Sequence, residues 1–167
     1  MHSNLRILAS SVLTAANTAN IPIAVAESCT AGLLSQTLAD AEGAGQWFAG
    51  GFVTYTKEQK IAVLGVPPAL IAEKTAVCCE VALAMAEGAL RASAAQATTA
   101  ITGVAGPEPD EDGNPVGRVC IAVSRAGFPS RAFERDYGEL DRDVLRQRAV
   151  ADALRALRDA LAVSLVT

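Results

Sequence analysis

Histidine is almost absent from this sequence of 167 residues. The single histidine, His2, lies next to the first residue, where chains are seldom well ordered. A Ser-His-Asp triad or a Cys-His pair needs an imidazole base. The scarcity of histidine therefore argues against a nucleophilic site with a histidine base, and it excludes metal clusters built from several histidines.

Signatures of other common protein classes are missing as well. The apolar stretches are far shorter than a membrane span, and the N-terminal segment shows no cleavage pattern after an apolar block. We therefore expect a cytoplasmic protein that does not span a membrane. No GxGxxG or Walker-type phosphate loop occurs. The net charge of −4 differs from the basic character that nucleic-acid binders usually show, so we expect no nucleic-acid partner.

Cysteine is present in a pattern that suggests neither zinc nor disulfides. The spacing of the four cysteines matches no zinc motif, and two adjacent cysteines are poorly placed to bridge each other. We interpret them as reduced, small core residues, and we predict no metal site and no cofactor. The four residues are Cys29, Cys78, Cys79 and Cys120.

Short apolar segments of two kinds alternate along the chain. Helical patterns are expected at 3–19, 30–41, 57–65, within 70–93 and from about 141 onward, and buried strands at 21–28, 50–56, 97–104, 118–125 and 131–138. Helices alternating with strands and then a hairpin predict an α/β fold: a three-layer α/β/α sandwich with a mixed, mostly parallel sheet of about five strands. We expect a single domain over residues 1–167. The buried face of the last helix is predicted to contain Val150, Leu154, Leu157 and Leu161.

Reactive side chains follow the first predicted strand, in the segment AESCTAGLL at residues 26–34. Ligands of such sheets bind beyond the carboxyl ends of the strands, and the first turn of a helix favours negative charge there. Ser28 could attack a carbonyl while neighbouring amides stabilise the oxyanion. The competing interpretation is that Ser28 or Thr30 only caps the helix.

Lysine is rare, with three residues against eleven arginines, and two of the three lie in TYTKEQK after the second predicted strand. Unlike arginine, a lysine loses its proton when it is desolvated. Without a usable histidine, Lys57 or Lys60 is the natural candidate base for a serine. Tyr55 is close enough in sequence to relay or orient a proton. The alternative for both lysines is an ordinary solvated helix start.

Two further stretches suggest ligand contacts. TGVAGP, at residues 102–107, ends the third predicted strand, and Gly103 and Gly106 would allow a ligand to approach the backbone; a tight turn is the alternative. Arg142 and Arg146 lie one turn apart near the start of the last helix, where they could hold a phosphate or carboxylate. The alternative is pairing with the acids at positions 141, 143 and 152.

Together these stretches resemble one family, the CinA C-terminal domain, which includes the stand-alone nicotinamide-nucleotide amidase. The resemblance covers about residues 5–162. It implies hydrolysis of the carboxamide of nicotinamide mononucleotide to nicotinate mononucleotide and ammonia, without a metal or cofactor, by a homodimer or larger homo-oligomer. The segments that carry it, in order, are AESCTAGLLSQTLAD, GGFVTYTKEQKIAVLGV, MAEGA, TGVAGP, PVG and DRDVLRQRAVADAL.

The resemblance also implies roles for individual residues. Ser28 would be the nucleophile, Lys60 rather than Lys57 the general base, and Tyr55 a catalytic residue near that lysine. Arg142 would reach the substrate at its phosphate. The residues implied to bind the substrate are Cys29, Thr30, Gly32, Thr102, Gly103 and Arg142.

Two departures from the family pattern bear on the pocket. Ala31 stands where the family usually has glycine, and EPDEDG at residues 108–113 replaces a usual glycine pair. The alternatives are therefore a non-catalytic nucleotide-binding regulatory module, or an amidase that acts on another small amide. Cys29 is the rival nucleophile, because a helix start favours a thiolate.

Overall fold

Five strands form one mixed sheet in the computed structural model, which describes residues 2–163. The order across the sheet is β2-β1-β3-β4-β5. β1 pairs in parallel with β2 and β3, whereas β4 is antiparallel to β3 and β5. All strands except β4 thus run in one direction, which confirms the prediction of a mixed, mostly parallel sheet. The strands are β1 Ile23–Glu27, β2 Phe48–Val53, β3 Ala97–Gly103, β4 Arg118–Arg125 and β5 Arg131–Asp136.

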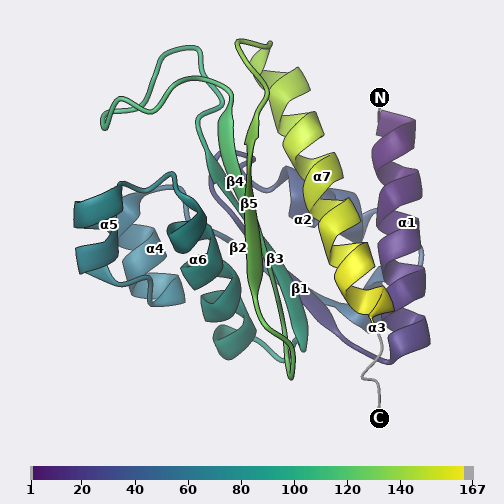
Figure 1. The fold of residues 1–167 in the computed structure, drawn as a ribbon. Helices are drawn as coiled ribbons and strands as arrows, with labels where there is room; N and C mark the ends of the chain where they lie inside the picture. Colours follow the sequence, from purple (N-terminus) through teal and green to yellow (C-terminus); the bar gives the residue numbers. More distant parts are fainter. Residues whose placement is uncertain (1, 164–167) are drawn as a thin grey trace.

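Helices cover both faces of this sheet, so the predicted three-layer architecture is confirmed (Figure 1). One layer contains α1, α2, α3 and α7, and the other contains α4, α5 and α6. No helix within residues 2–163 combines the length and the apolar character needed to cross a membrane. The helices are α1 His2–Ala19, α2 Leu33–Ala39, α3 Ala44–Trp47, α4 Lys57–Leu64, α5 Pro68–Lys74, α6 Cys79–Ala92 and α7 Arg142–Ala162.

The two helical layers enclose two hydrophobic cores of different character. Under α1 and α7 the strands contribute large aliphatic side chains, and the predicted buried face of α7 packs onto them. Under α6 the strands contribute mainly alanine, cysteine and threonine. These small side chains let α6 approach the sheet so closely that the Thr98 hydroxyl of β3 donates to the carbonyl of Ala86 in α6 at 2.7 Å.

The local structure differs from the sequence prediction mainly around the sharp turns. The helix expected from residue 30 begins only at Leu33, because Ala31 and Gly32 have φ angles of 52° and 101°. These left-handed angles interrupt a right-handed helix. The short helix α3 lies where the sequence indicates only a turn, and β2 begins two residues earlier than expected.

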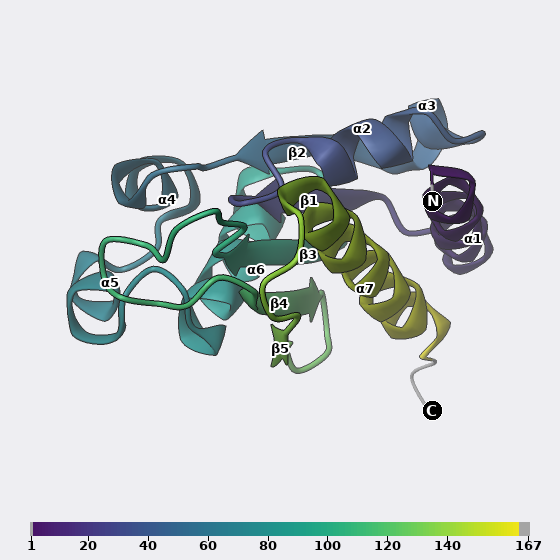
Figure 2. The ribbon, with the colours of Figure 1, turned by 90° about the horizontal axis from the view of Figure 1, so that it is seen from above.

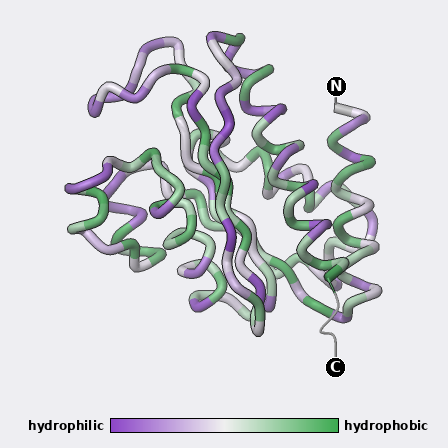
Figure 3. Tube along the Cα trace, viewed as in Figure 1, coloured by the Kyte–Doolittle hydropathy of each residue, from purple (hydrophilic) through white to green (hydrophobic). Residues whose placement is uncertain are grey.

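The parallel strands β1, β2 and β3 end at the same edge of the sheet, and Figure 2 looks onto that edge. The segments that follow them lie side by side: the Ser28 N–H donates to the Ile101 carbonyl of β3, and the Thr54 N–H donates to the Glu27 carbonyl of β1. The largely hydrophilic loop between β3 and β4 also lies at this edge (Figure 3). This arrangement brings several of the predicted site residues together.

Candidate active site

A serine hydroxyl and a buried lysine meet at the carboxyl edge of the sheet. Ser28 directly follows β1, and Lys60 lies in the first half of α4. The Lys60 Nζ atom donates to Ser28 Oγ at 2.8 Å and to the Thr54 carbonyl at 3.0 Å. Only 2% of Lys60 is exposed to solvent. Of the two lysines in this stretch, the structure therefore brings Lys60 and not Lys57 to Ser28.

The burial of Lys60 changes its acid–base chemistry. Desolvation lowers its pKa from about 10.5 to about 8, although the nearby Cys29 and Glu58 oppose part of this shift. At pH 7 about a tenth of the Lys60 side chains are then neutral. A neutral amine can accept the Ser28 proton while one of its own N–H groups still donates to the Thr54 carbonyl. The pair thus has the geometry and the pKa of a nucleophile with its general base.

The position of Lys60 depends on how α4 is held. The Thr56 hydroxyl caps the helix by accepting the Gln59 N–H at 3.2 Å. On the buried side, α4 lies against Gly88 of α6, where an added Cβ atom would come within 2.1 Å of the Leu64 carbonyl oxygen. Only glycine permits this close approach to α6 of α4, the helix that carries Lys60.

Ser28 and Lys60 open onto a cavity of about 500 Å³, a volume typical of small-molecule sites. The segments that follow β1, β2 and β3 form its wall together with the start of α7. Most of the predicted site residues contribute to this wall. They are Ser28, Cys29, Tyr55, Lys60, Thr102, Gly103 and Arg142.

Arg142 and Tyr55 hold each other at the mouth of the cavity. Arg142 donates to the Gly106 carbonyl at 2.6 Å and to the Tyr55 hydroxyl at 3.0 Å. It therefore reaches the cavity wall and not a neighbouring acid. Within residues 2–163 no hydrogen bond joins the Tyr55 hydroxyl to Ser28 or Lys60; the Tyr55 backbone carbonyl instead accepts from Ser28 Oγ at 3.5 Å. The proton relay through Tyr55 stays a prediction.

Cys29 is poorly suited to be the nucleophile. It is buried, and burial raises the pKa of its thiol from about 9 to about 12. The thiol consequently stays protonated at neutral pH, and a protonated thiol is a weak nucleophile. The Cys29 carbonyl accepts a 2.7 Å hydrogen bond from Arg146 Nε, which fastens the segment after β1 to α7. Arg146 thus supports the backbone beside Ser28.

Thr102 and Gly103 shape the floor of the cavity. The Thr102 hydroxyl donates to the Ala76 carbonyl at 2.8 Å, which links β3 to the segment before α6. A Cβ atom on Gly103 would lie 2.7 Å from the Val119 side chain and 2.8 Å from the Arg118 carbonyl oxygen. The absence of a side chain at Gly103 therefore lets β3 and β4 stay close where the cavity begins.

Glu27 is the main residue of the candidate site that the sequence analysis did not single out. It is the last residue of β1 and is fully buried. Its carboxylate accepts the Thr30 hydroxyl at 2.7 Å and the N–H groups of Gly32 and Leu34 at 3.1 and 3.0 Å. It also accepts both the N–H and the hydroxyl of Ser35, at 2.8 and 2.7 Å. The start of α2 thereby stabilises a buried negative charge.

This network bears on two predictions. Thr30 and Gly32 are bound to Glu27 behind the nucleophile segment and do not line the cavity. They hold the turn that presents Ser28, and their contact with a substrate stays a prediction. The helix-cap interpretation is also wrong for Ser28, because α2 begins after Gly32 and the carboxylate of Glu27, not the Ser28 hydroxyl, accepts the first-turn N–H groups of Leu34 and Ser35. The sequence feature that could have indicated this network is the carboxylate of Glu27 at the end of an otherwise apolar strand.

The cysteines and acids provide no evident metal centre. All four cysteines are free, with Cys79 half-buried and the other three buried. Within residues 2–163 no three or more His, Cys, Asp or Glu side chains gather in a way that could hold a metal ion.

Comparison with known proteins gives one consistent family. The sequence model described as "CinA C-terminal domain" matches residues 5–161. A CinA-like protein of Geobacter sulfurreducens is 43% identical over 139 residues, which cover 83% of this chain and 33% of that protein. A CinA-like protein of Myxococcus xanthus is 42% identical over 90% of this chain and 35% of its own length. The chain thus spans about a third of the length of these curated relatives.

Solved structures show the same fold at nearly full coverage. The competence/damage inducible protein CihA of Agrobacterium tumefaciens superposes with a TM-score of 0.89 at 35% identity, covering 95% of both chains. A competence-damaged protein (CinA) superfamily protein of Escherichia coli gives a TM-score of 0.88 at 31% identity over 95% of this chain and 90% of that chain.

Proposed function

The chain belongs to the CinA C-terminal domain family, and from this premise we propose that it is an amidohydrolase with Ser28 as nucleophile and Lys60 as general base. The single observation that supports this function best is the 2.8 Å hydrogen bond between Lys60 Nζ and Ser28 Oγ at the wall of a cavity. The proposed substrate is nicotinamide mononucleotide, and the products are nicotinate mononucleotide and ammonia.

The first half of the proposed reaction forms an acyl-enzyme. Neutral Lys60 takes the Ser28 proton as Oγ attacks the carboxamide carbon, and backbone N–H groups beside Ser28 stabilise the oxyanion. The tetrahedral intermediate then expels ammonia, which receives its proton from the Lys60 ammonium. The C–N bond is broken, Ser28 carries the nicotinoyl ester, and Lys60 is neutral again.

The second half releases the acid. Lys60 takes a proton from a water molecule that attacks the ester carbonyl, and the collapsing intermediate returns the bond electrons to Ser28 Oγ, which is reprotonated by Lys60. One water is consumed for each ammonia released. One base is enough, because in each half of the reaction Lys60 first accepts a proton from the nucleophile and then donates it to the leaving group.

A binding module without catalysis explains the site less well. A lysine with 2% exposure is costly to bury, because its charged form loses solvation. Simple ligand binding does not require that amine to lie against a serine hydroxyl, whereas nucleophile activation does. The buried pair therefore favours the enzyme over the regulatory module.

Ammonia release from nicotinamide mononucleotide tests the proposal. We expect Ser28→Ala and Lys60→Ala each to lower kcat by about a thousandfold or more, since each removes part of one catalytic unit. Cys29→Ala, which changes the adjacent buried residue, is the matched control and should keep kcat within about fivefold. Undiminished ammonia release by Ser28→Ala would refute the serine mechanism. A panel of other small amides then tests the substrate.

A further inference from the structure

The turn between β1 and α2 has a strained backbone, and Glu27 holds it. Ala31 and Gly32 follow each other with φ angles of 52° and 101°. A left-handed angle is unfavourable for alanine because of its Cβ atom, so the turn persists only where surrounding contacts fix it. Five hydrogen bonds to the buried Glu27 carboxylate provide these contacts, and they reach from Thr30 to Ser35, across both residues.

These contacts also determine which N–H groups of the turn are free. Six of the eight N–H groups in residues 28–35 have an acceptor: three donate to backbone carbonyl oxygens and three to the Glu27 carboxylate. Within residues 2–163, the N–H groups of Cys29 and Thr30 are the two of this segment that have no acceptor. Of these two residues, only Cys29 lines the cavity beside Ser28.

The free N–H group of Cys29 directly follows the proposed nucleophile. Cys29 is buried, and buried N–H groups are normally paired. An unpaired N–H group beside a reacting carbonyl is the kind of donor that stabilises an oxyanion. We propose that Glu27 is a positioning residue, which fixes the turn so that the Cys29 N–H group stays available to the oxyanion formed on attack by Ser28. This inference rests on the proposed amidase function. Glu27 itself does not line the cavity, so it acts through the turn.

The hydrogen-bond pattern requires a carboxylate at position 27. Its Oε2 atom accepts the N–H groups of Gly32 and Leu34, and its Oε1 atom accepts that of Ser35. A glutamine has one acceptor oxygen, so in either orientation its NH2 group would face a backbone N–H group, which cannot become an acceptor. Glu27→Gln therefore keeps the size of the side chain but breaks its hold on the turn. Removal of a negative charge alone would instead favour a nearby oxyanion and raise kcat.

Kinetics with nicotinamide mononucleotide test the positioning role. We expect Glu27→Gln to lower kcat about a hundredfold and to leave KM within about threefold, because the lost stabilisation acts only in the transition state. Thr30→Val, which removes one donor to Glu27 and keeps the size of the side chain, should lower kcat about tenfold. The matched control is Thr98→Val. It removes another buried threonine hydroxyl with a 2.7 Å hydrogen bond, to the Ala86 carbonyl of α6, and should keep kcat within about twofold.

A boronic acid separates positioning from a general loss of structure. Pyridine-3-boronic acid places boron where the substrate has its carboxamide carbon, and boron forms a tetrahedral adduct with a serine hydroxyl, which boron NMR detects. Nicotinamide has the same ring, but its carboxamide stays planar. We expect Glu27→Gln to weaken binding of the boronic acid about tenfold more than binding of nicotinamide, because only the adduct resembles the oxyanion intermediate. Equal weakening of both ligands would indicate a loss of structure alone and refute the positioning role.

The outcomes distinguish this inference from the proposed function. If the parent protein releases ammonia and both Glu27→Gln and Thr30→Val keep its kcat, the positioning role is refuted and the amidase stands. If the parent releases no ammonia but forms an adduct that Glu27→Gln weakens as described, the amidase is refuted and the positioning role stands. A parent protein that neither releases ammonia nor forms the adduct would overturn both. If Glu27→Gln does not fold, Thr30→Val provides the same comparisons.

Discussion

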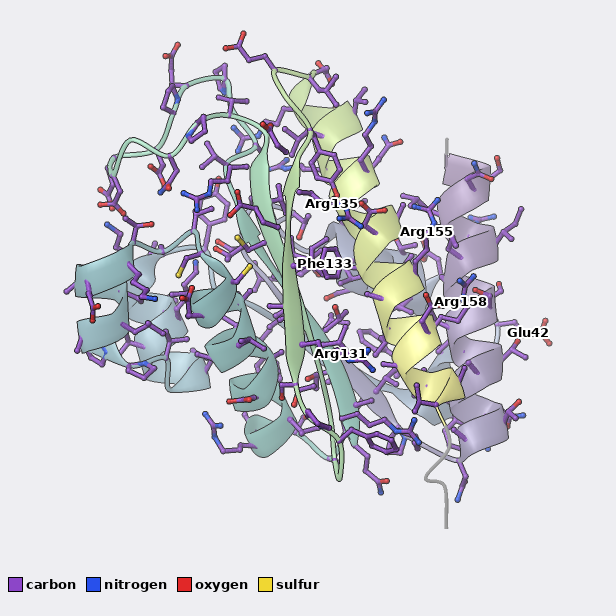
Figure 4. The ribbon with its side chains drawn as sticks, viewed as in Figure 1. Glu42, Arg131, Phe133, Arg135, Arg155 and Arg158 are labelled. Carbon is purple, nitrogen blue, oxygen red and sulfur yellow. The ribbon has the colours of Figure 1, made fainter. Side chains whose placement is uncertain are left out.

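At the scale of single residues, the site depends on where the chain uses lysine. Arginine supplies much of the ordinary surface charge, and Figure 4 shows Arg135, Arg155 and Arg158 on β5 and α7. Their guanidinium groups pair there with aspartates. Two of the three lysines instead line the cavity. An arginine could not replace Lys60, because a guanidinium keeps its proton at any physiological pH.

The pH dependence of acylation follows from the pKa of Lys60. The reactive form is the neutral amine, and the pKa is lowered to about 8 by burial. We therefore expect kcat/KM for ammonia release to be nearly constant above pH 9, to fall about fivefold between pH 8 and pH 7, and to fall about tenfold per pH unit below pH 7. Fixed-time ammonia assays between pH 6 and 10 measure this dependence of kcat/KM on pH.

Lys60→Arg is the matched control for that profile, since it keeps a positive charge but no titratable base. It should be inactive at every pH up to 10. A rate that stays flat from pH 5 to 9 in the parent protein, with chemistry limiting turnover, would contradict a lysine base.

Individual site residues were predictable where one residue type alone could do the chemistry. Ser28 and Lys60 could be named from the lack of histidine, from the rarity of lysine and from the family resemblance, and the structure places their side chains in contact. Thr30 and Gly32 contact Glu27 and not the wall of the cavity at Ser28, which a one-dimensional motif could not show, because it does not reveal which side of a turn faces the cavity. The role of Glu27 needed the three-dimensional course of the turn into α2.

At the scale of secondary-structure elements, the fold was predictable where the hydrophobic period was regular. The long helices α1 and α7 and the hairpin strands β4 and β5 agree closely with their expected ranges. The errors cluster at α2, α3 and β2, where positive φ angles and short helices override local composition. The position of the proposed base Lys60 involves one contact between elements in particular, the packing of α4 against α6 at Gly88.

Gly88→Ala tests that contact. The added methyl group would overlap the Leu64 carbonyl oxygen at 2.1 Å, so α4 must move away from α6 and carry Lys60 with it. We expect a loss of about 1–3 kcal/mol in the free energy of unfolding, as for other overpacked cores. A displacement of about 1 Å at the base should also lower kcat about a hundredfold in the folded variant. Urea unfolding and ammonia release measure the two effects.

Gly45→Ala is the control with the same chemical change. Gly45 lies inside α3, where an added Cβ atom has no neighbour within 4 Å. It should leave kcat unchanged and leave stability equal or slightly higher, because alanine favours a helix. Normal activity in Gly88→Ala would show that the depth of Lys60 does not depend on the α4–α6 contact.

At the scale of the whole molecule, the site lies where the two cores meet the edge of the sheet. Ser28 follows β1, which is buried on both faces, and precedes α2 in one helical layer. Lys60 belongs to α4 in the other helical layer. The fold must therefore hold a cationic group inside its packed interior. Such a group reduces global stability, and in the proposed mechanism it is the base, as expected when function competes with stability.

The sign of this cost follows from proton binding in the two states. Folding lowers the pKa of Lys60 from about 10.5 to about 8. Between these values the unfolded chain binds more protons than the folded protein, so stability rises with pH in that window. Below pH 8 both states are protonated, and the full penalty of about 3 kcal/mol is present.

Lys60→Met removes this penalty together with the titration. We expect the stability advantage of the variant over the parent to shrink by about 2 to 3 kcal/mol between pH 7 and pH 10, because only the parent gains stability as its lysine deprotonates. Urea unfolding of the parent and the variant gives the difference in their free energies of unfolding at each pH. The titration of other groups affects both proteins equally and therefore cancels in each difference. Lys74→Met is the control: Lys74 is exposed and pairs with Glu80, which raises its pKa, so this variant should show no such decrease. A Lys60→Met difference that is constant with pH would mean that Lys60 keeps its ordinary pKa in the folded protein, and it could then not serve as the base near neutral pH.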